Sequence, residues 1–210
     1  MEQTLSHENL QKAFIDLQKK NWEGAEENLK KLLEDANQKQ DVLLQSTAYS
    51  CLGLLAQLKK QWKESWRYYE KAEKLDPQNS YYKLLVARLL LRLFGQNDTA
   101  IKKCEKIIMQ ENIAPALRHQ AYITIGSAYL KKSDRKRAAK SLLQSIGDHF
   151  AGIEKMSDLD MSLLEALLRK NTGAEECKYF LEEAKMLALN LKDLKAADQL
   201  TKLLISFPEN

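Results

Sequence analysis

Apolar and small side chains recur along the chain with helical spacing, in two consecutive segments that a short polar turn separates. In the clearest example, Tyr49, Leu52 and Ala56 share one face of a first helix, and Tyr69 and Ala72 share one face of a second. Residues three and four positions apart are neighbours on a helix surface, so each segment predicts an amphipathic helix.

Three further residues complete this unit. Gly53 and Ser65 are small, which lets two antiparallel helices approach closely where they cross. Pro77 cannot continue a helix and therefore ends the unit.

The same order of residue types recurs before and after this unit. It predicts four helix pairs, at about residues 6–37, 46–79, 80–113 and 119–146. In the third pair the turn Gly95–Asp98 is expected to be one residue longer than the others.

The unit over residues 46–79 resembles the tetratricopeptide repeat. In that repeat the order over about 34 residues is Trp or Tyr, Leu-Gly, Tyr, a small residue, an aromatic residue, Ala and Pro. It departs from that pattern at Ala56, where an aromatic residue is usual, and at Ser65, where Ala is usual. The resemblance implies an all-α, right-handed α–α superhelix of about eleven helices, a tetratricopeptide-type solenoid.

The carboxyl-terminal third follows the pattern less closely. We expect residues 1–146 to hold the four regular pairs and residues 147–210 to continue the same solenoid. The latter would contain a loop, an extra helix near 158–171 and a degenerate fifth pair that closes at Phe207-Pro208.

In such arrays the first helix of each pair lines a concave groove that binds a partner polypeptide, so the resemblance implies a protein-interaction module, an adaptor or a holding chaperone. The residues that helical phase assigns to this groove are Leu10, Phe14, Leu17, Ser50, Leu54, Gln57, Tyr81, Leu84, Arg88, Arg92, Ile123, Ser127 and Lys131. Their content predicts a partner segment with apolar anchors and acidic flanks. Alternatively, these apolar positions are packed core or are covered by the chain itself. Self-association through Trp66 is a further alternative.

Charge is concentrated in the middle of the chain. The formal net charge is +4, yet residues 81–140 hold thirteen Lys and Arg against four Asp and Glu. Nucleic-acid or acidic-ligand binding through this segment is therefore the alternative function. The densest part, residues 131–137, is either a phosphate or acidic-partner patch or a solvated turn whose long basic stems cover apolar neighbours.

No pattern in the sequence predicts chemistry. The three Cys are far apart, and His7, His119 and His149 lack metal-ligand spacing, so we expect reduced thiols, no metal and no cofactor. No phosphate loop, nucleophile elbow or zinc-protease motif occurs, which predicts that the protein is not an enzyme. The start of the sequence has no signal-peptide pattern and no apolar run is long enough to cross a bilayer, so a cytoplasmic protein is expected.

Overall fold

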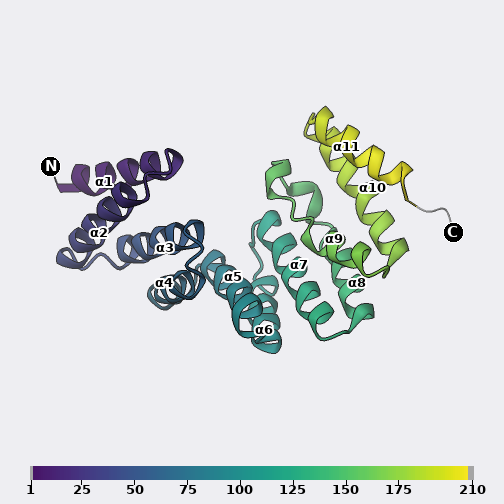
Figure 1. The fold of residues 1–210 in the computed structure, drawn as a ribbon, viewed down its shortest axis with the longest axis horizontal. Coiled ribbons are helices and arrows are strands. Elements are labelled where there is room, and N and C mark those ends of the chain that lie inside the picture. Colours follow the sequence, from purple (N-terminus) through teal and green to yellow (C-terminus); the bar gives the residue numbers. More distant parts are fainter. Residues whose placement is uncertain (1, 208–210) are drawn as a thin grey trace. The chain divides into compact units, whose positions relative to one another are not determined.

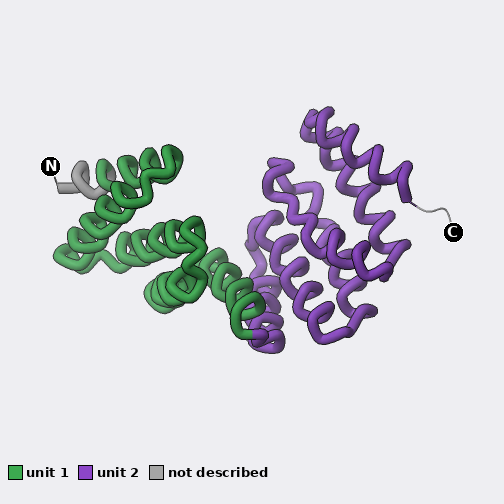
Figure 2. Tube along the Cα trace, in the orientation of Figure 1, with its two compact units in different colours: residues 1–94 green, residues 95–210 purple. Residues whose placement is uncertain are grey.

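The computed structural model describes residues 2–207, with side chains from residue 8 onward, and these residues form eleven α-helices and no strand (Figure 1). Met1, the side chain of His7 and Pro208 lie outside the described residues. The chain divides into two compact units, Met1–Phe94 (unit 1) and Gly95–Asn210 (unit 2) (Figure 2). The boundary falls within the pair predicted over residues 80–113. The division into a domain 1–146 and its continuation 147–210 stays a prediction.

Unit 1 consists of helices that pack on their neighbours in chain order. They are α1 (Glu2–Gln18), α2 (Trp22–Gln38), α3 (Val42–Leu58), α4 (Trp62–Leu75) and α5 (Ser80–Leu89), which continues into the π-helix η1 (Leu90–Phe94). A Cβ atom added to Gly53 of α3 would lie 2.7 Å from the ring of Tyr69 on α4. The small residue therefore lets the Tyr69 ring lie directly on the backbone of α3.

One turn geometry joins the helices of each pair. In each turn, the residue before the cap of the second helix has a left-handed backbone. These residues are Lys20, Lys60, Gly95, Ser133 and Lys192. Several caps are side-chain caps, such as Asp134, whose carboxylate accepts a 3.0 Å hydrogen bond from the Arg137 backbone N–H.

The third turn has this same geometry, so the predicted longer turn at Gly95–Asp98 is wrong. The additional residue lies in the preceding helix, where the i→i+5 hydrogen bonding of η1 takes up one more residue per turn.

Unit 2 contains two helix pairs and an inserted short helix. Its elements are α6 (Asn97–Ile108), α7 (Pro115–Lys131), α8 (Arg135–Gln144), the 3-10 turns η2 (Phe150–Gly152) and η3 (Met156–Asp158), α9 (Ser162–Arg169), α10 (Ala174–Asn190) and α11 (Leu194–Ile205). Helix α7 packs between α6 and α8, and α10 packs between α8 and α11.

Helix α9 packs against α7, α8 and α10. Its Leu163 is fully buried over Gly126 of α7, where an added Cβ atom would lie 2.2 Å from Leu163 Cδ2. Gly126 occupies the pattern position of Gly53, but the group that it admits comes from the inserted helix.

A buried histidine fixes the segment that leads into α9. Nδ1 of His119 donates to the Ser145 carbonyl at 3.0 Å, and Nε2 accepts from the Asp160 backbone N–H at 3.0 Å. These two bonds fix the neutral Nδ1–H tautomer and join α7 to both ends of the connection from α8 to α9.

Candidate protein-binding surface

Three large side chains are exposed on the first helices of unit 1, at positions assigned to the groove. Phe14 on α1, Leu54 on α3 and Tyr81 on α5 are 45%, 38% and 52% exposed. Further apolar side chains accompany them on α1 and α3: Ile15, Leu43 and Leu58.

Helix α3 carries the longest exposed stripe. Leu43, Leu54 and Leu58 are exposed and Ser50 is half-buried, and their spacing places all four on one helical face. Gln57, beside this stripe, accepts a 3.3 Å hydrogen bond from the hydroxyl of Tyr69. Burial raises the pKa of Tyr69, so this hydroxyl keeps the proton that it donates.

Helix α5 and η1 bring the positive charge of this surface. Arg88 is half-buried, and the exposed Arg92 holds its guanidinium 3.7 Å above the Trp62 ring. Leu84, in contrast, is fully buried at 0% exposure. It is a core residue, and assigning it to the groove does not fit the structure because its side chain offers no surface to a partner.

Two other groove positions of unit 1 are partly core. Leu10 and Leu17 on α1 are half-buried and pack against the cluster that α1, α2 and α3 share. Trp66 is also half-buried, with its ring 5.1 Å from that of Phe94 in an edge arrangement, so it is not an exposed contact residue.

In unit 2 the equivalent face of α7 is covered by the chain itself. Ile123 is 1% exposed and belongs to the core that includes α9, so its assignment to the groove does not fit either. Gln120 donates a 3.3 Å hydrogen bond to the Asp158 carbonyl in the segment before α9. Ser127 is half-buried, and only Lys131 is exposed. The predicted positions that share an open surface therefore lie in unit 1.

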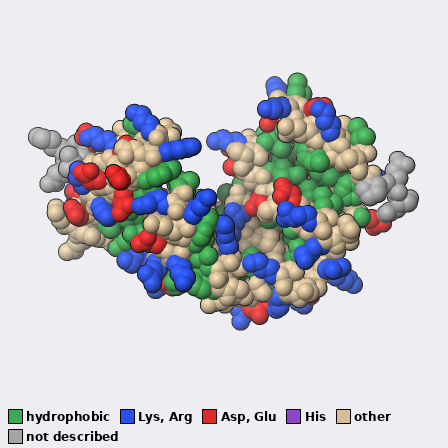
Figure 3. Space-filling model, in the orientation of Figure 1, with side chains coloured by type: hydrophobic (Ala, Val, Ile, Leu, Met, Phe, Trp, Pro, Cys, Tyr) green, Lys and Arg blue, Asp and Glu red, His purple; other side chains and the backbone are tan. Residues whose placement is uncertain are grey.

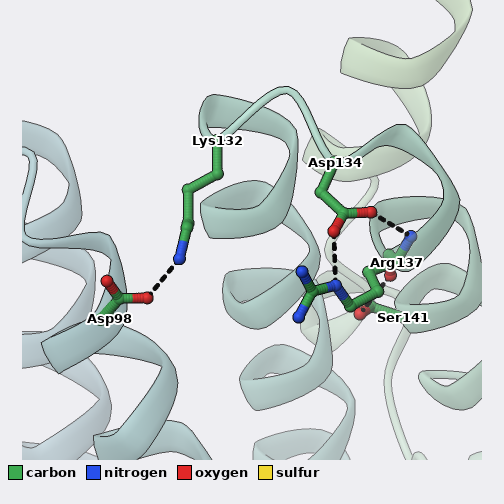
Figure 4. Close-up of polar contacts among 5 residues, drawn as sticks. All are labelled: Asp98, Lys132, Asp134, Arg137 and Ser141. Atoms are coloured by element: carbon green, nitrogen blue, oxygen red, sulfur yellow. Dashed lines mark hydrogen bonds and ion pairs between the residues drawn. The ribbon is translucent and has the colours of Figure 1, made fainter.

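The basic turn 131–137 contains ion pairs with local structural roles (Figure 4). Lys132 lies 2.5 Å from Asp98 of α6, and Arg137 pairs with Asp134 while its guanidinium lies 4.6 Å above the Tyr129 ring. The hydrogen bond and charge of Lys132 hold the pKa of Asp98 below its usual range, which keeps this pair ionised.

A similar ion pair occurs in unit 1. Lys59 at the end of α3 lies 3.0 Å from Glu26 of α2, 33 residues away, while Lys132 and Asp98 are 34 residues apart. Both separations are about one repeat length, so the two ion pairs are equivalent in the repeat. In each, a lysine at the end of the first helix of one pair contacts the second helix of the preceding pair.

The three thiols are buried. Cys51, Cys104 and Cys177 form no disulfide, and burial raises the pKa of Cys51 and of Cys177 to about 11. Both thiols are therefore protonated at neutral pH and are poor nucleophiles and metal ligands. Among the described residues, no group of three or more His, Cys, Asp and Glu could hold a metal ion. Over residues 2–207, no helix has the length and apolar character needed to cross a membrane.

Sequence reasoning missed the apolar exposure of the carboxyl-terminal helices, where Figure 3 shows hydrophobic side chains gathered in unit 2. The exposed side chains lie on different faces: Tyr179 and Met186 of α10 line one pocket, and Leu203 of α11 lines another. The other large exposed ones are Leu189, Leu194 and Ile205. Their alternation with buried residues was visible in the sequence. Their exposure was not, because it depends on which neighbours cover each face.

The fold is of the tetratricopeptide-repeat type. Its helices form antiparallel pairs, one residue in each intervening turn has left-handed backbone, and small residues lie at helix crossings. Three solved structures illustrate the similarity. PilW, a widely conserved type IV pilus biogenesis factor, has a TM-score of 0.65 and 14% identity, over 98% of this chain and 94% of that chain.

PilF of Pseudomonas aeruginosa has a TM-score of 0.63 and 16% identity, over 97% of this chain and 91% of that chain. A tetratricopeptide repeat protein from Parabacteroides merdae has a TM-score of 0.57 and 14% identity, over 99% and 81% of the two chains. No family model matches the chain, and no curated protein matches it. At these identities the structures confirm the predicted all-α tetratricopeptide-type fold.

Proposed function

We propose that this protein is an interaction module that binds a partner polypeptide on the first-helix surface of unit 1, as an adaptor or a holding chaperone. The observation that carries the proposal is the exposure of Phe14, Leu54 and Tyr81 on α1, α3 and α5, at positions that helical phase and the repeat pattern had assigned to a groove. Large apolar side chains grouped on a surface lose contact with water when a partner covers them, and that burial favours binding.

The partner of this surface is a segment with apolar anchors and acidic flanks. Leu43, Leu54 and Leu58 offer an apolar row that Ser50 interrupts, and Arg88 and Arg92 provide positive charge on α5 and η1. Arg92 is held over Trp62, so less side-chain freedom is lost when it meets a carboxylate. PilW, which has a similar fold, is a pilus biogenesis factor, and that role agrees with an assembly function.

The protein acts by binding, without catalysis or a cofactor, in the cytoplasm. Buried thiols that stay reduced and protonated suit a reducing compartment. The paired acids Glu182 and Glu183 lie on an exposed or partly exposed face of α10, where no enclosed site surrounds them.

Peptide display against the whole protein tests the proposal. Selected peptides should share apolar positions flanked by Asp or Glu, and the double variant Leu54→Glu with Arg88→Glu should weaken their binding by about tenfold or more. Helicity and thermal unfolding should change little, because Leu54 is partly exposed and Arg88 is only half-buried.

The matched control is Leu194→Glu with Lys195→Glu, which makes the same changes at exposed positions of α11 in unit 2. It should bind the selected peptides as the unaltered protein does. If every selected peptide binds the Leu54→Glu, Arg88→Glu protein with unchanged affinity, the site lies elsewhere.

Nucleic-acid binding is the weaker candidate. Within the basic turn, Lys132 and Arg137 are paired with Asp98 and Asp134, and Arg137 covers a face of the Tyr129 ring on which a base could stack. Binding of a mixed RNA and DNA pool that falls steeply with added salt would favour this alternative.

A further inference from the structure

Two pockets occupy equivalent places in the two units, between the second helix of one pair and both helices of the next. In unit 1 the pocket between α2, α3 and α4 has a volume of about 100 Å³, and in unit 2 the pocket between α6, α7 and α8 has a volume of about 310 Å³. The first is lined by Glu26, Leu52, Leu55, Ala56, Lys59, Gln61, Glu64 and Tyr68. The second is lined by Glu105, Ile108, Met109, Tyr122, Ile125, Tyr129, Arg137, Lys140, Ser141 and Gln144.

One of the positions that differ between the two linings changes from a large to a small side chain. When Gly126 is placed on Gly53, Ser133 falls on Lys60 and Ser141 falls on Tyr68. The Tyr68 ring packs beside Tyr49 with centroids 6.3 Å apart, so it fills much of the space in unit 1.

Ser141 leaves the same space empty in unit 2. Its hydroxyl donates a 2.8 Å hydrogen bond to the Arg137 carbonyl of its own helix (Figure 4).

The charge at this position of the repeat is also reversed. The pocket of unit 1 contains Glu64, and the same alignment puts Arg137 in its place and Lys140 in place of Arg67. Helices α6 to α8 with their connections, residues 97–144, hold ten Lys and Arg against four Asp and Glu. Within the unit 2 lining Arg137 is paired with Asp134, so Lys140 is the lining cation that can reach a ligand, on helices whose net charge is +6.

The unit 2 pocket has apolar walls beside its polar side chains. Ile108, Ile125 and the Tyr rings form its walls, and Met109 at the edge is 80% exposed. A volume of about 310 Å³ is large enough for one bulky side chain with its adjoining backbone. Lys140 is exposed on α8, where it can meet a carboxylate beside such an anchor.

We infer that the pocket between α6, α7 and α8 is a docking site for an acidic peptide segment that inserts a single apolar side chain. The apolar side chains of the pocket accept the anchor, and Lys140, together with the net positive charge of α6 to α8, attracts the acidic residues on either side. A nucleic acid fits this site less well, because apolar walls contribute nothing to phosphate binding and the Tyr129 ring is already covered by Arg137.

Fluorescence anisotropy with defined probes on the whole protein tests the inference. The probes are a short labelled peptide of Asp and Glu around one central Phe, the same peptide with central Ala, and a single-stranded RNA of equal length. The Phe peptide should bind, and the Ala peptide should bind about tenfold more weakly because the anchor is lost. RNA should bind less tightly than the Phe peptide.

Three variants locate the probe in the pocket. Ser141→Tyr restores the side chain that fills the pocket of unit 1 and should remove binding, and Lys140→Glu should weaken it by about fivefold or more. Met109→Gln should weaken the Phe peptide more than the Ala peptide. Lys140 and Met109 are exposed, so their variants keep the test valid if Ser141→Tyr fails to fold.

The control Arg135→Glu makes the same charge change as Lys140→Glu on the same helix, at a residue that does not line the pocket, and should change affinity by no more than about twofold. The Leu54→Glu, Arg88→Glu protein should bind the Phe peptide normally, which separates this site from the surface of unit 1. The inference is overturned if the Phe peptide does not bind, if it binds Lys140→Glu and Met109→Gln unchanged, or if RNA binds more tightly.

Discussion

Single turn residues carry backbone geometry that their side chains do not favour. Lys20, Lys60, Ser133 and Lys192 have φ between 58° and 63°, a left-handed conformation that costs a residue with a Cβ atom about 1 kcal/mol. Gly95 takes the same geometry, at φ 61°, without that cost. Each of these residues is followed by the cap of the next helix. The left-handed backbone is therefore part of the turn that joins the two helices, whichever residue type occupies the position.

Ser133→Gly should therefore stabilise the protein by about 0.5–1 kcal/mol, because Gly adopts the left-handed region without a steric penalty. Urea unfolding followed by circular dichroism measures the change. Lys136→Gly, within α8, is the control and should destabilise by about 1 kcal/mol. A Ser133→Gly protein that is less stable than the parent would mean that the Ser side chain contributes more than the backbone strain costs.

At the scale of elements, one pattern position serves two different contacts. Gly53 lies under Tyr69 of its own pair, as the repeat pattern predicts, whereas Gly126 lies under Leu163 of the inserted helix α9. Helix α9 thereby covers the face of α7 that carries Ile123, and in unit 2 it closes the surface that stays open in unit 1.

A double-mutant cycle between Gly126 and Leu163 tests this contact. Leu163→Ala should destabilise by about 2–5 kcal/mol in the parent, because the side chain is fully buried. In the Gly126→Ala background Leu163 is already displaced, so the same change should cost at least about 1 kcal/mol less. Equal costs in the two backgrounds, measured by urea unfolding, would show that Gly126 does not position α9.

For the whole molecule, the division into two units separates the two proposed sites. The surface of Phe14, Leu54 and Tyr81 lies in unit 1, and the pocket beside Lys140 lies in unit 2. Each unit has a hydrophobic cluster of its own, and stability in repeat proteins is largely a sum over neighbouring pairs.

The fragments 1–94 and 95–210 should therefore each fold and keep one activity. Circular dichroism should show helical, cooperative unfolding of both. Fragment 95–210 should bind the acidic Phe peptide, and fragment 1–94 should bind the display-selected peptides. A fragment that is unfolded alone, while the whole chain is folded, would show that the units stabilise one another.

The sequence alone determined the helix pairs and their turns, because these depend on local spacing: apolar residues three and four apart, Gly53 at a crossing and polar caps such as Asp134. It also identified Leu54 and Tyr81 as surface positions. Tertiary structure decided the rest. Leu84 and Ile123 share the helical phase of exposed residues but are buried, since burial depends on which helix lies opposite. Whether a pocket is filled, as by Tyr68, or open, as at Ser141, likewise depends on side chains that meet only after the pairs stack.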